Sequence, residues 1–102
     1  MIKLTSWTRY QLLELIRHND EMVRRSLVML YHRQTVDEKQ RQETKHQNGR
    51  GFNAFDAPAL IGLAECYLRT RHLSPQQIYF IRKKLLKYIR QIQEEANHGT
   101  IN

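Results

Sequence analysis

The chain has 102 residues, a length that predicts a single domain spanning 1–102. Its 17 Lys and Arg outnumber its 10 Asp and Glu and give a net charge of +7, which favours an anionic partner, usually nucleic acid, over a basic protein with no such partner. One cysteine excludes an internal disulfide, the first ten residues lack an apolar core of signal-peptide length, and no apolar run approaches the roughly 20 residues of a membrane span, so we expect a cytoplasmic protein with no membrane partner.

The first predicted element is one long helix over about 6–34, with Thr5 and Ser6 as candidate N-caps. Because the apolar face stays in phase across the HND sequence at 18–20, the pattern favours a continuous helix. The alternative is a break at which Asn19 or Asp20 caps a second helix. Seven side chains form the face at 100° per residue: Leu12, Leu13, Ile16, Val23, Leu27, Leu30 and Tyr31.

A charged arm and a glycine loop follow over 35–55. Thr35 and Glu38 fit a capping box, but Val36 is the one apolar residue of TVDEKQRQETKHQ, so the segment is either a solvated helical extension or a mobile arm. The sequence NGRGFNAFDAP then predicts a turn at its two glycines, with Phe52 or Phe55 packed on the core.

A short apolar helix is predicted after this loop. Asp56 is a candidate N-cap with Pro58 in the first turn, and Leu60, Leu63, Ala64 and Tyr67 share one side. Gly62 in mid-helix costs up to about 1 kcal/mol relative to alanine, which predicts the close approach of another backbone as compensation.

The last predicted helix runs from Pro75 to about Asn97, with Ser74 as N-cap and Gln77 completing a capping box. Arg82 falls inside its apolar arc and is expected to pair with Glu65 or Asp20. No segment alternates at period two for long enough to be a strand. The predicted fold is therefore all-α: a long N-terminal helix packed on a C-terminal helical hairpin in a small helical bundle.

The far side of the last helix carries the strongest chemical signal. Phe80, Lys83, Lys84 and Lys87 are spaced i, i+3, i+4 and i+7, so they are surface neighbours, and Arg90 continues the stripe. An aromatic ring among lysines is typical of surfaces that stack bases and contact phosphates. The alternative is that the ring packs on another helix or subunit while the lysines are solvated.

The turn RTRH, at 69–72, brings two more cations to the start of this helix. Arg69 and Arg71 could hold a phosphate together with free N–H groups near Gln76 and Gln77, or they could complement the dipole of the preceding helix. A helix-turn-helix reading, in which the two glutamines and Tyr79 reach bases, is disfavoured because the last helix has a long apolar stripe.

Nothing in the sequence predicts an enzyme, a cofactor or a metal. The NGRG sequence lacks the GK[ST] ending and the preceding strand of a phosphate-binding loop. Cys66 lies within a predicted helix and reads as a small apolar residue. The five histidines match no metal-ligand spacing: His18, His32, His46, His72 and His98.

The order of motifs resembles a short helical module of phage, plasmid and other mobile-element proteins, some with helicase-like or other nucleic-acid-processing parts. Its pattern is an N-G-x-G-F-[NT] loop, an acidic helix cap, a short apolar helix, and L-[ST]-x-[KQ]-Q opening a basic helix. The resemblance spans about 25–92 and implies an association with nucleic acid. The matching residues are Asn48, Gly49, Gly51, Phe52, Asn53, Asp56, Leu73, Ser74, Gln77, Lys83, Lys84, Leu85, Lys87 and Tyr88.

Two classes of function fit these observations. The leading prediction is a small basic accessory protein of phage or mobile-element origin that binds nucleic acid or a nucleoprotein complex. The alternative is a protein-interaction module, such as a phage-encoded inhibitor of a host defence protein, that docks through its phenylalanines; a homodimer also stays open. The predicted contact residues are Arg50, Phe52, Arg69, Arg71, Phe80, Lys83, Lys84, Lys87 and Arg90.

Overall fold

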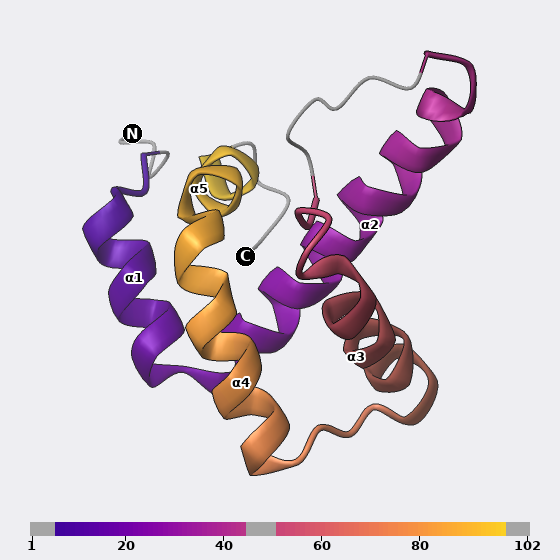
Figure 1. Cartoon of the computed structure of the whole chain (residues 1–102). Coiled ribbons are helices and arrows are strands. Elements are labelled where there is room, and N and C mark those ends of the chain that lie inside the picture. Colours follow the sequence, from indigo (N-terminus) through magenta and orange to yellow (C-terminus); the bar gives the residue numbers. More distant parts are fainter. Residues whose placement is uncertain (1–5, 45–50, 98–102) are drawn as a thin grey trace.

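The structure, a computed structural model, describes residues 6–44 and 51–97, with side chains over 6–34 and 51–97. Over these residues the chain is all-α, as predicted, and it contains no strand (Figure 1). The elements are α1 (Arg9–His18), α2 (Asp20–Thr44), α3 (Ala57–Thr70), α4 (Pro75–Leu85), the 3₁₀ turn η1 (Leu86–Tyr88) and α5 (Ile89–Asn97).

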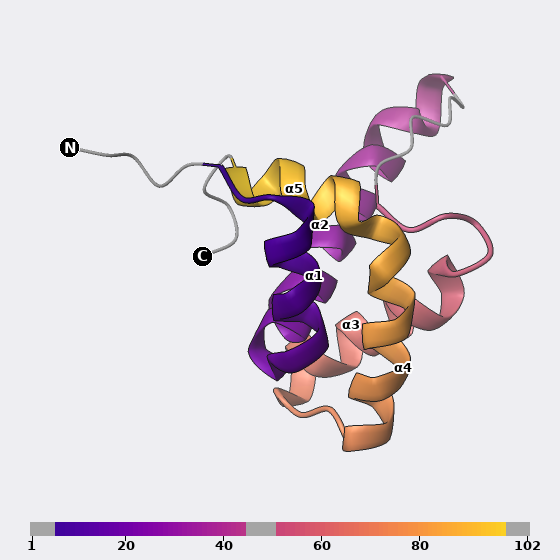
Figure 2. The same cartoon turned by 90° about the vertical axis from the view of Figure 1, so that its left-hand side faces the viewer.

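Helix α2 organises the bundle, because it packs against α1, α3, α4 and α5. Helices α1 and α3 lie on opposite sides of the molecule, and α1 also packs against α4 and α5 (Figures 1 and 2). The core draws on every helix, so no pair of helices buries its apolar face alone. Its fully buried large apolar side chains are Leu12, Ile16, Val23, Leu27, Leu30, Leu60, Ile81, Leu85 and Ile92.

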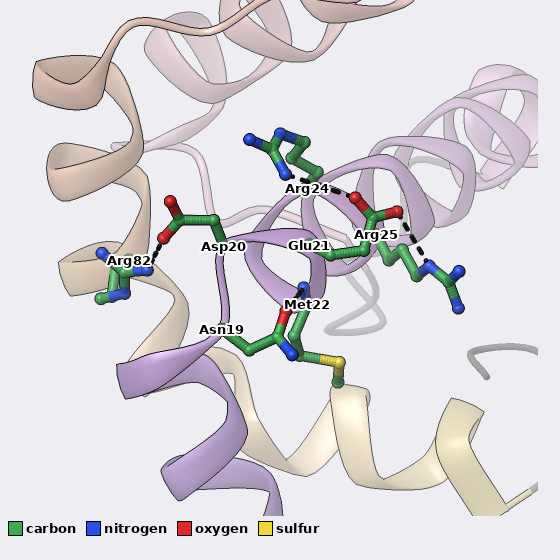
Figure 3. A network of polar contacts seen from close by, with 7 residues as sticks. All are labelled: Asn19, Asp20, Glu21, Met22, Arg24, Arg25 and Arg82. Carbon is green, nitrogen blue, oxygen red and sulfur yellow. Dashed lines mark hydrogen bonds and ion pairs between the residues drawn. The ribbon is translucent and has the colours of Figure 1, made fainter.

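The prediction of one continuous helix over 6–34 is wrong, because the chain breaks at Asn19 (Figure 3). Asn19 adopts an extended conformation, ends α1, and accepts a hydrogen bond on its side-chain oxygen from the Met22 N–H at 3.0 Å. It therefore caps α2, as the alternative proposed. The first cap is also displaced from the predicted Thr5 or Ser6, since Thr8 forms a full capping box with Gln11.

Arg82 of α4 contacts both α1 and α2 at the point where the two helices meet. Its Nε donates to the Ile16 carbonyl at 2.7 Å, and its guanidinium pairs with Asp20 (Figure 3). Of the two predicted partners, Asp20 is thus the one observed, while Glu65 accepts a hydrogen bond from the Tyr31 hydroxyl at 3.0 Å. The arginine satisfies a carbonyl at the end of α1 that has no helical partner.

The C-terminal segment begins and ends where the sequence predicts, with a capping box at Ser74 and Gln77 and a last helical residue at Asn97. It is not one straight helix, however. The η1 turn interrupts it, and α5 leaves the line of α4 to pack on α1 (Figure 2). There the Asn97 side-chain oxygen accepts a hydrogen bond from the Trp7 N–H at 2.7 Å, which ties the two ends of the domain together.

In the middle of the chain, the structure decides the form of the charged segment and the surroundings of Gly62. The charged segment continues as helix up to Thr44, so over 35–44 it is the helical extension and not a separate arm. The close approach expected at Gly62 is absent, since a Cβ built there meets no atom within 4 Å.

Candidate functional site

The described part of the glycine loop, 51–56, is held to the bundle through its backbone. Gly51 has φ +79° and lies against α2, so close that a Cβ would fall 2.7 Å from the Gln34 Cα. Its N–H donates to the Gln91 side chain at 2.7 Å and its carbonyl accepts from that side chain at 2.9 Å. The Phe52 N–H donates to the Gln34 side-chain oxygen at 2.8 Å. Glycine is needed here both for the left-handed conformation and for the close approach.

The two phenylalanines of the loop have opposite environments. Phe52 is 4% exposed and packs edge-on against the Tyr88 ring, with centroids 5.9 Å apart. It therefore lies in the core and is not part of a contact surface, contrary to its place among the predicted contact residues. Phe55 is 86% exposed. The loop is anchored by one ring and presents the other to solvent.

Asp56 lies buried beneath this loop, and its carboxylate joins the loop to the lysines of α4 and η1. One carboxylate oxygen accepts a hydrogen bond from the Tyr88 hydroxyl at 2.6 Å and lies 2.8 Å from the Lys87 ammonium. The other oxygen has the Lys84 ammonium 3.6 Å away and no hydrogen-bond partner among the described residues. The Tyr88 hydroxyl in turn accepts from the Asn53 N–H at 3.0 Å.

The electrostatics of this cluster favour an ionised carboxylate and a neutral phenol. Burial acts to raise the pKa of Asp56, but hydrogen bonds from Lys87 and Tyr88 and the charges of Lys87 and Lys84 outweigh it, so the pKa lies below its ordinary value of 3.8. Burial, together with the hydrogen bond to the Asp56 carboxylate and its charge, raises the pKa of Tyr88 to about 12. Asp56 was predicted to cap α3, yet its side chain forms no capping hydrogen bond and holds lysines instead.

Aromatic rings and ammonium groups lie close together on α4 and at Phe55. The Lys84 ammonium lies 5.5 Å from the centroid of the Phe80 ring and 6.0 Å from that of Phe55, and the Lys83 ammonium lies 5.3 Å from that of Tyr79. These distances are in the range of cation–π contacts. Tyr79 is 61% exposed and Phe80 38%. We call this surface the aromatic–lysine face; it consists of Phe55, Tyr79, Phe80, Lys83, Lys84 and Lys87.

The structure thus brings together four of the nine predicted contact residues: Phe80, Lys83, Lys84 and Lys87. Arg90 is exposed and follows Lys87 by three residues, so it continues the face into α5. Arg50 lies outside the described residues.

The two arginines of the RTRH turn lie at the end of α3, at the far end of this helix from Phe55. Helix α3 has 14 residues and is therefore about 20 Å long, with the exposed Phe55 just before its start and Arg69 in its last turn. Arg71 ends the helix in a left-handed conformation, with its guanidinium 5.6 Å from the Tyr67 ring. The Gln77 N–H, expected to help hold a phosphate, already donates to the Ser74 hydroxyl. The turn does not form a phosphate site with that donor.

Sequence reasoning missed the residues that organise the face. Phe55 was predicted either to pack on the core or to serve as a docking anchor, and Asp56 was predicted to be a helix cap; neither was placed with the lysines of α4. No local signal links Asp56 to Lys84 and Lys87, about 30 residues later, because the contact exists only once α3 and α4 are folded on α2. The part of the face that the sequence predicted is the group spaced i, i+3, i+4 and i+7 on α4, because this spacing makes residues neighbours on any helix.

Comparisons with protein-family models, with curated proteins and with solved structures found no match to this chain. No helix in the described ranges is both long and apolar enough to span a membrane. Within the same ranges, no three His, Cys, Asp or Glu side chains gather as metal ligands would.

Proposed function

We propose that this protein binds nucleic acid, alone or in a nucleoprotein complex, through the aromatic–lysine face. The observation that carries the proposal is the Lys84 ammonium set between two solvent-facing rings, Phe55 and Phe80. Aromatic rings that alternate with cations combine the two interactions that nucleic-acid surfaces use, base stacking and phosphate contact. The resemblance to mobile-element modules supports the same class of partner.

The charge around the face supports an anionic ligand. The stretch 66–93 contains seven Lys and Arg and no Asp or Glu. On and beside the face, Lys83, Lys84, Lys87 and Arg90 carry four positive charges, and Asp56 beneath them neutralises one. Within the described part of the chain, neither Lys83 nor Arg90 forms an ion pair, so both are open to phosphate.

Binding should be measured by fluorescence anisotropy with labelled DNA and RNA over a series of salt concentrations. The three net charges on and beside the face, with Arg90 counted, predict a log–log salt slope of about −2 for single strands and somewhat steeper for duplex. The Lys83→Ala/Arg90→Ala double variant should reduce the slope to about −0.7, because two phosphate contacts are lost.

The matched control is Arg17→Ala/Arg25→Ala, which removes two half-exposed cations from α1 and α2 and changes the net charge equally. If both double variants weaken binding to the same extent, binding follows net charge and the face is not the site. If the wild-type protein binds no nucleic acid at low salt, the proposal is wrong.

A second function is supported by the 86% exposure of Phe55, since a protruding ring is also a typical anchor for a protein partner. In that case the lysines would steer an acidic protein, such as the target of an inhibitor. A partner that stays bound to the tagged protein after nuclease treatment, and is lost with both Phe55→Ala and Lys83→Ala, would favour docking over nucleic-acid binding.

A further inference from the structure

The exposed rings of the aromatic–lysine face offer flat apolar surfaces on which a ligand can stack. Phe55 is 86% exposed, Tyr79 61% and Phe80 38%, so all three rings reach water and Phe55 is the most open of them. In duplex DNA or RNA the faces of the bases are stacked on one another, and only their edges and the phosphates can be reached from outside. A single strand exposes base faces that can stack on aromatic side chains. The rings therefore have a use with a single strand that they lack with a duplex.

The order of groups on the face also matches a single strand. The Lys84 ammonium lies near both Phe55 and Phe80, and the Lys83 ammonium lies near Tyr79, so each of these two cations has a ring 5.3–6.0 Å away. A strand with splayed bases presents phosphates and bases in alternation along its length. Lys84 and Lys87 are also held from below by the buried Asp56 carboxylate, which fixes where phosphates can be met.

The ring of Phe55 is presented on a fixed support. The loop that carries it is held by backbone hydrogen bonds to Gln34, Gln91 and Tyr88, and the Asn53 side chain accepts from the Asp56 N–H at 2.8 Å. An exposed phenylalanine on an anchored loop does not gain burial by folding back on its own domain. A support of this kind lowers the entropy lost when a ligand is ordered on it.

From these observations we infer that the ligand of the aromatic–lysine face is a single-stranded nucleic acid, with bases stacked on Phe55 and Phe80 and phosphates on Lys83 and Lys84. This inference rests on the proposed function and adds the strandedness of the ligand and the roles of the rings.

The test compares four labelled probes of about 15 nucleotides: single-stranded DNA, the RNA of the same sequence, the DNA duplex, and an abasic single strand with the same phosphates. The wild-type protein should bind one or both normal single strands at least tenfold more tightly than the duplex and the abasic strand. The DNA and RNA probes distinguish the two sources of a single strand.

Phe55→Ala should weaken single-strand binding by roughly five- to 150-fold, the range found for removing one stacked aromatic ring. Phe55→Leu should weaken single-strand binding nearly as much as Phe55→Ala. Phe55→Tyr should retain binding, because stacking needs a ring and not merely an apolar side chain. The matched control is Tyr10→Ala, which removes a 69% exposed ring from α1 and should leave binding unchanged. Neither Phe55 nor Tyr10 is buried, so both variants should keep the wild-type circular dichroism spectrum.

Equal affinity for duplex and single strand, or unchanged binding by Phe55→Ala, would overturn the inference. If the Lys83/Arg90 double variant weakens binding while the Phe55 variants do not, the face binds nucleic acid but the single-strand inference is wrong. If no probe binds at low salt, the proposed function and the inference are both wrong. If Phe55→Leu binds like the wild-type protein, the ring acts as a general apolar anchor, and stacking is excluded.

Discussion

Asp56→Asn tests whether the buried carboxylate stabilises the fold as its geometry indicates. In the wild-type protein one carboxylate oxygen takes the Tyr88 hydroxyl at 2.6 Å and the Lys87 ammonium at 2.8 Å. Asparagine has nearly the same shape but no charge, so the Tyr88 hydrogen bond becomes a neutral one and both lysines lose their counter-ion.

The magnitude follows from these contacts. Hydrogen bonds to charged groups contribute about 1.5–3 kcal/mol and neutral ones about 1 kcal/mol, so weakening the Tyr88 bond costs about 1 kcal/mol. The Lys87 side chain is 46% exposed and can turn to water, which limits the loss of its ion pair to about 1–2 kcal/mol. The free energy of unfolding should therefore fall by about 2–3 kcal/mol, equivalent to a drop in Tm of roughly 10 °C or more.

The assay is urea unfolding at pH 7, followed by circular dichroism at 222 nm. Asp20→Asn is the matched control, because Asp20 also pairs with a cation, Arg82, but is 55% exposed and should cost less than about 1 kcal/mol. The pKa of Asp56 lies below 3.8 in the folded protein, so its contribution is fully present above pH 3.8 and is lost as the pH falls through the folded pKa. The stability difference between wild type and Asp56→Asn should therefore shrink only in acid. A difference at pH 7 no larger than that of the Asp20 control would refute the reasoning.

Four further substitutions test other parts of the fold by the same unfolding assay. Tyr88→Phe should remove a contribution to stability that depends on pH, because the pKa of Tyr88 is raised from 10.0 to about 12 in the folded protein. The wild-type protein should therefore lose stability relative to the variant as the pH rises above 10. A constant difference in the free energy of unfolding up to about pH 12 would contradict this. Gly62→Ala should raise the free energy of unfolding by up to about 1 kcal/mol, because the position is helical and open, whereas Gly51→Ala should lower it by more than about 2 kcal/mol, because of φ +79° and a Cβ 2.7 Å from the Gln34 Cα; effects of the same sign would refute the contrast. Ser26→Ala should stabilise by about 1 kcal/mol, since the hydroxyl is fully buried and has no hydrogen-bond partner in the described ranges, and a loss of stability would mean that the hydroxyl is bonded.

The features that could be predicted from the sequence are those set by nearby residues. The all-α class, the capping box that starts at Ser74, the turn at Gly51 and the end of the last helix near Asn97 all follow from local propensity or helical period. The position of Arg82 inside an apolar arc predicted an acidic partner, either Glu65 or Asp20, and Asp20 is the partner observed.

The failures occur where tertiary packing decides. The apolar face stays in phase across Asn19 because α1 and α2 both turn toward the same core, so phase could not reveal the break. Only the capping chemistry of Asn19 could have shown it. Gly62 was expected to meet a backbone, but whether a neighbour is present depends on where the other helices lie. For the same reason the sequence could not choose between Phe52 and Phe55 as the buried ring.

The buried Asp56 has opposite effects on charge and on geometry at the aromatic–lysine face. It neutralises one of four positive charges, which lowers the long-range attraction for phosphate, and it holds Lys87 and also Lys84, whose ammonium lies near the Phe55 and Phe80 rings. A surface selected for charge alone would do better without it, because each further phosphate contact steepens the single-strand salt slope by about 0.7. Asp56→Asn should therefore steepen the salt dependence of binding while weakening discrimination between normal and abasic strands. Steeper salt dependence with unchanged discrimination would show that the rings select bases without help from fixed lysines.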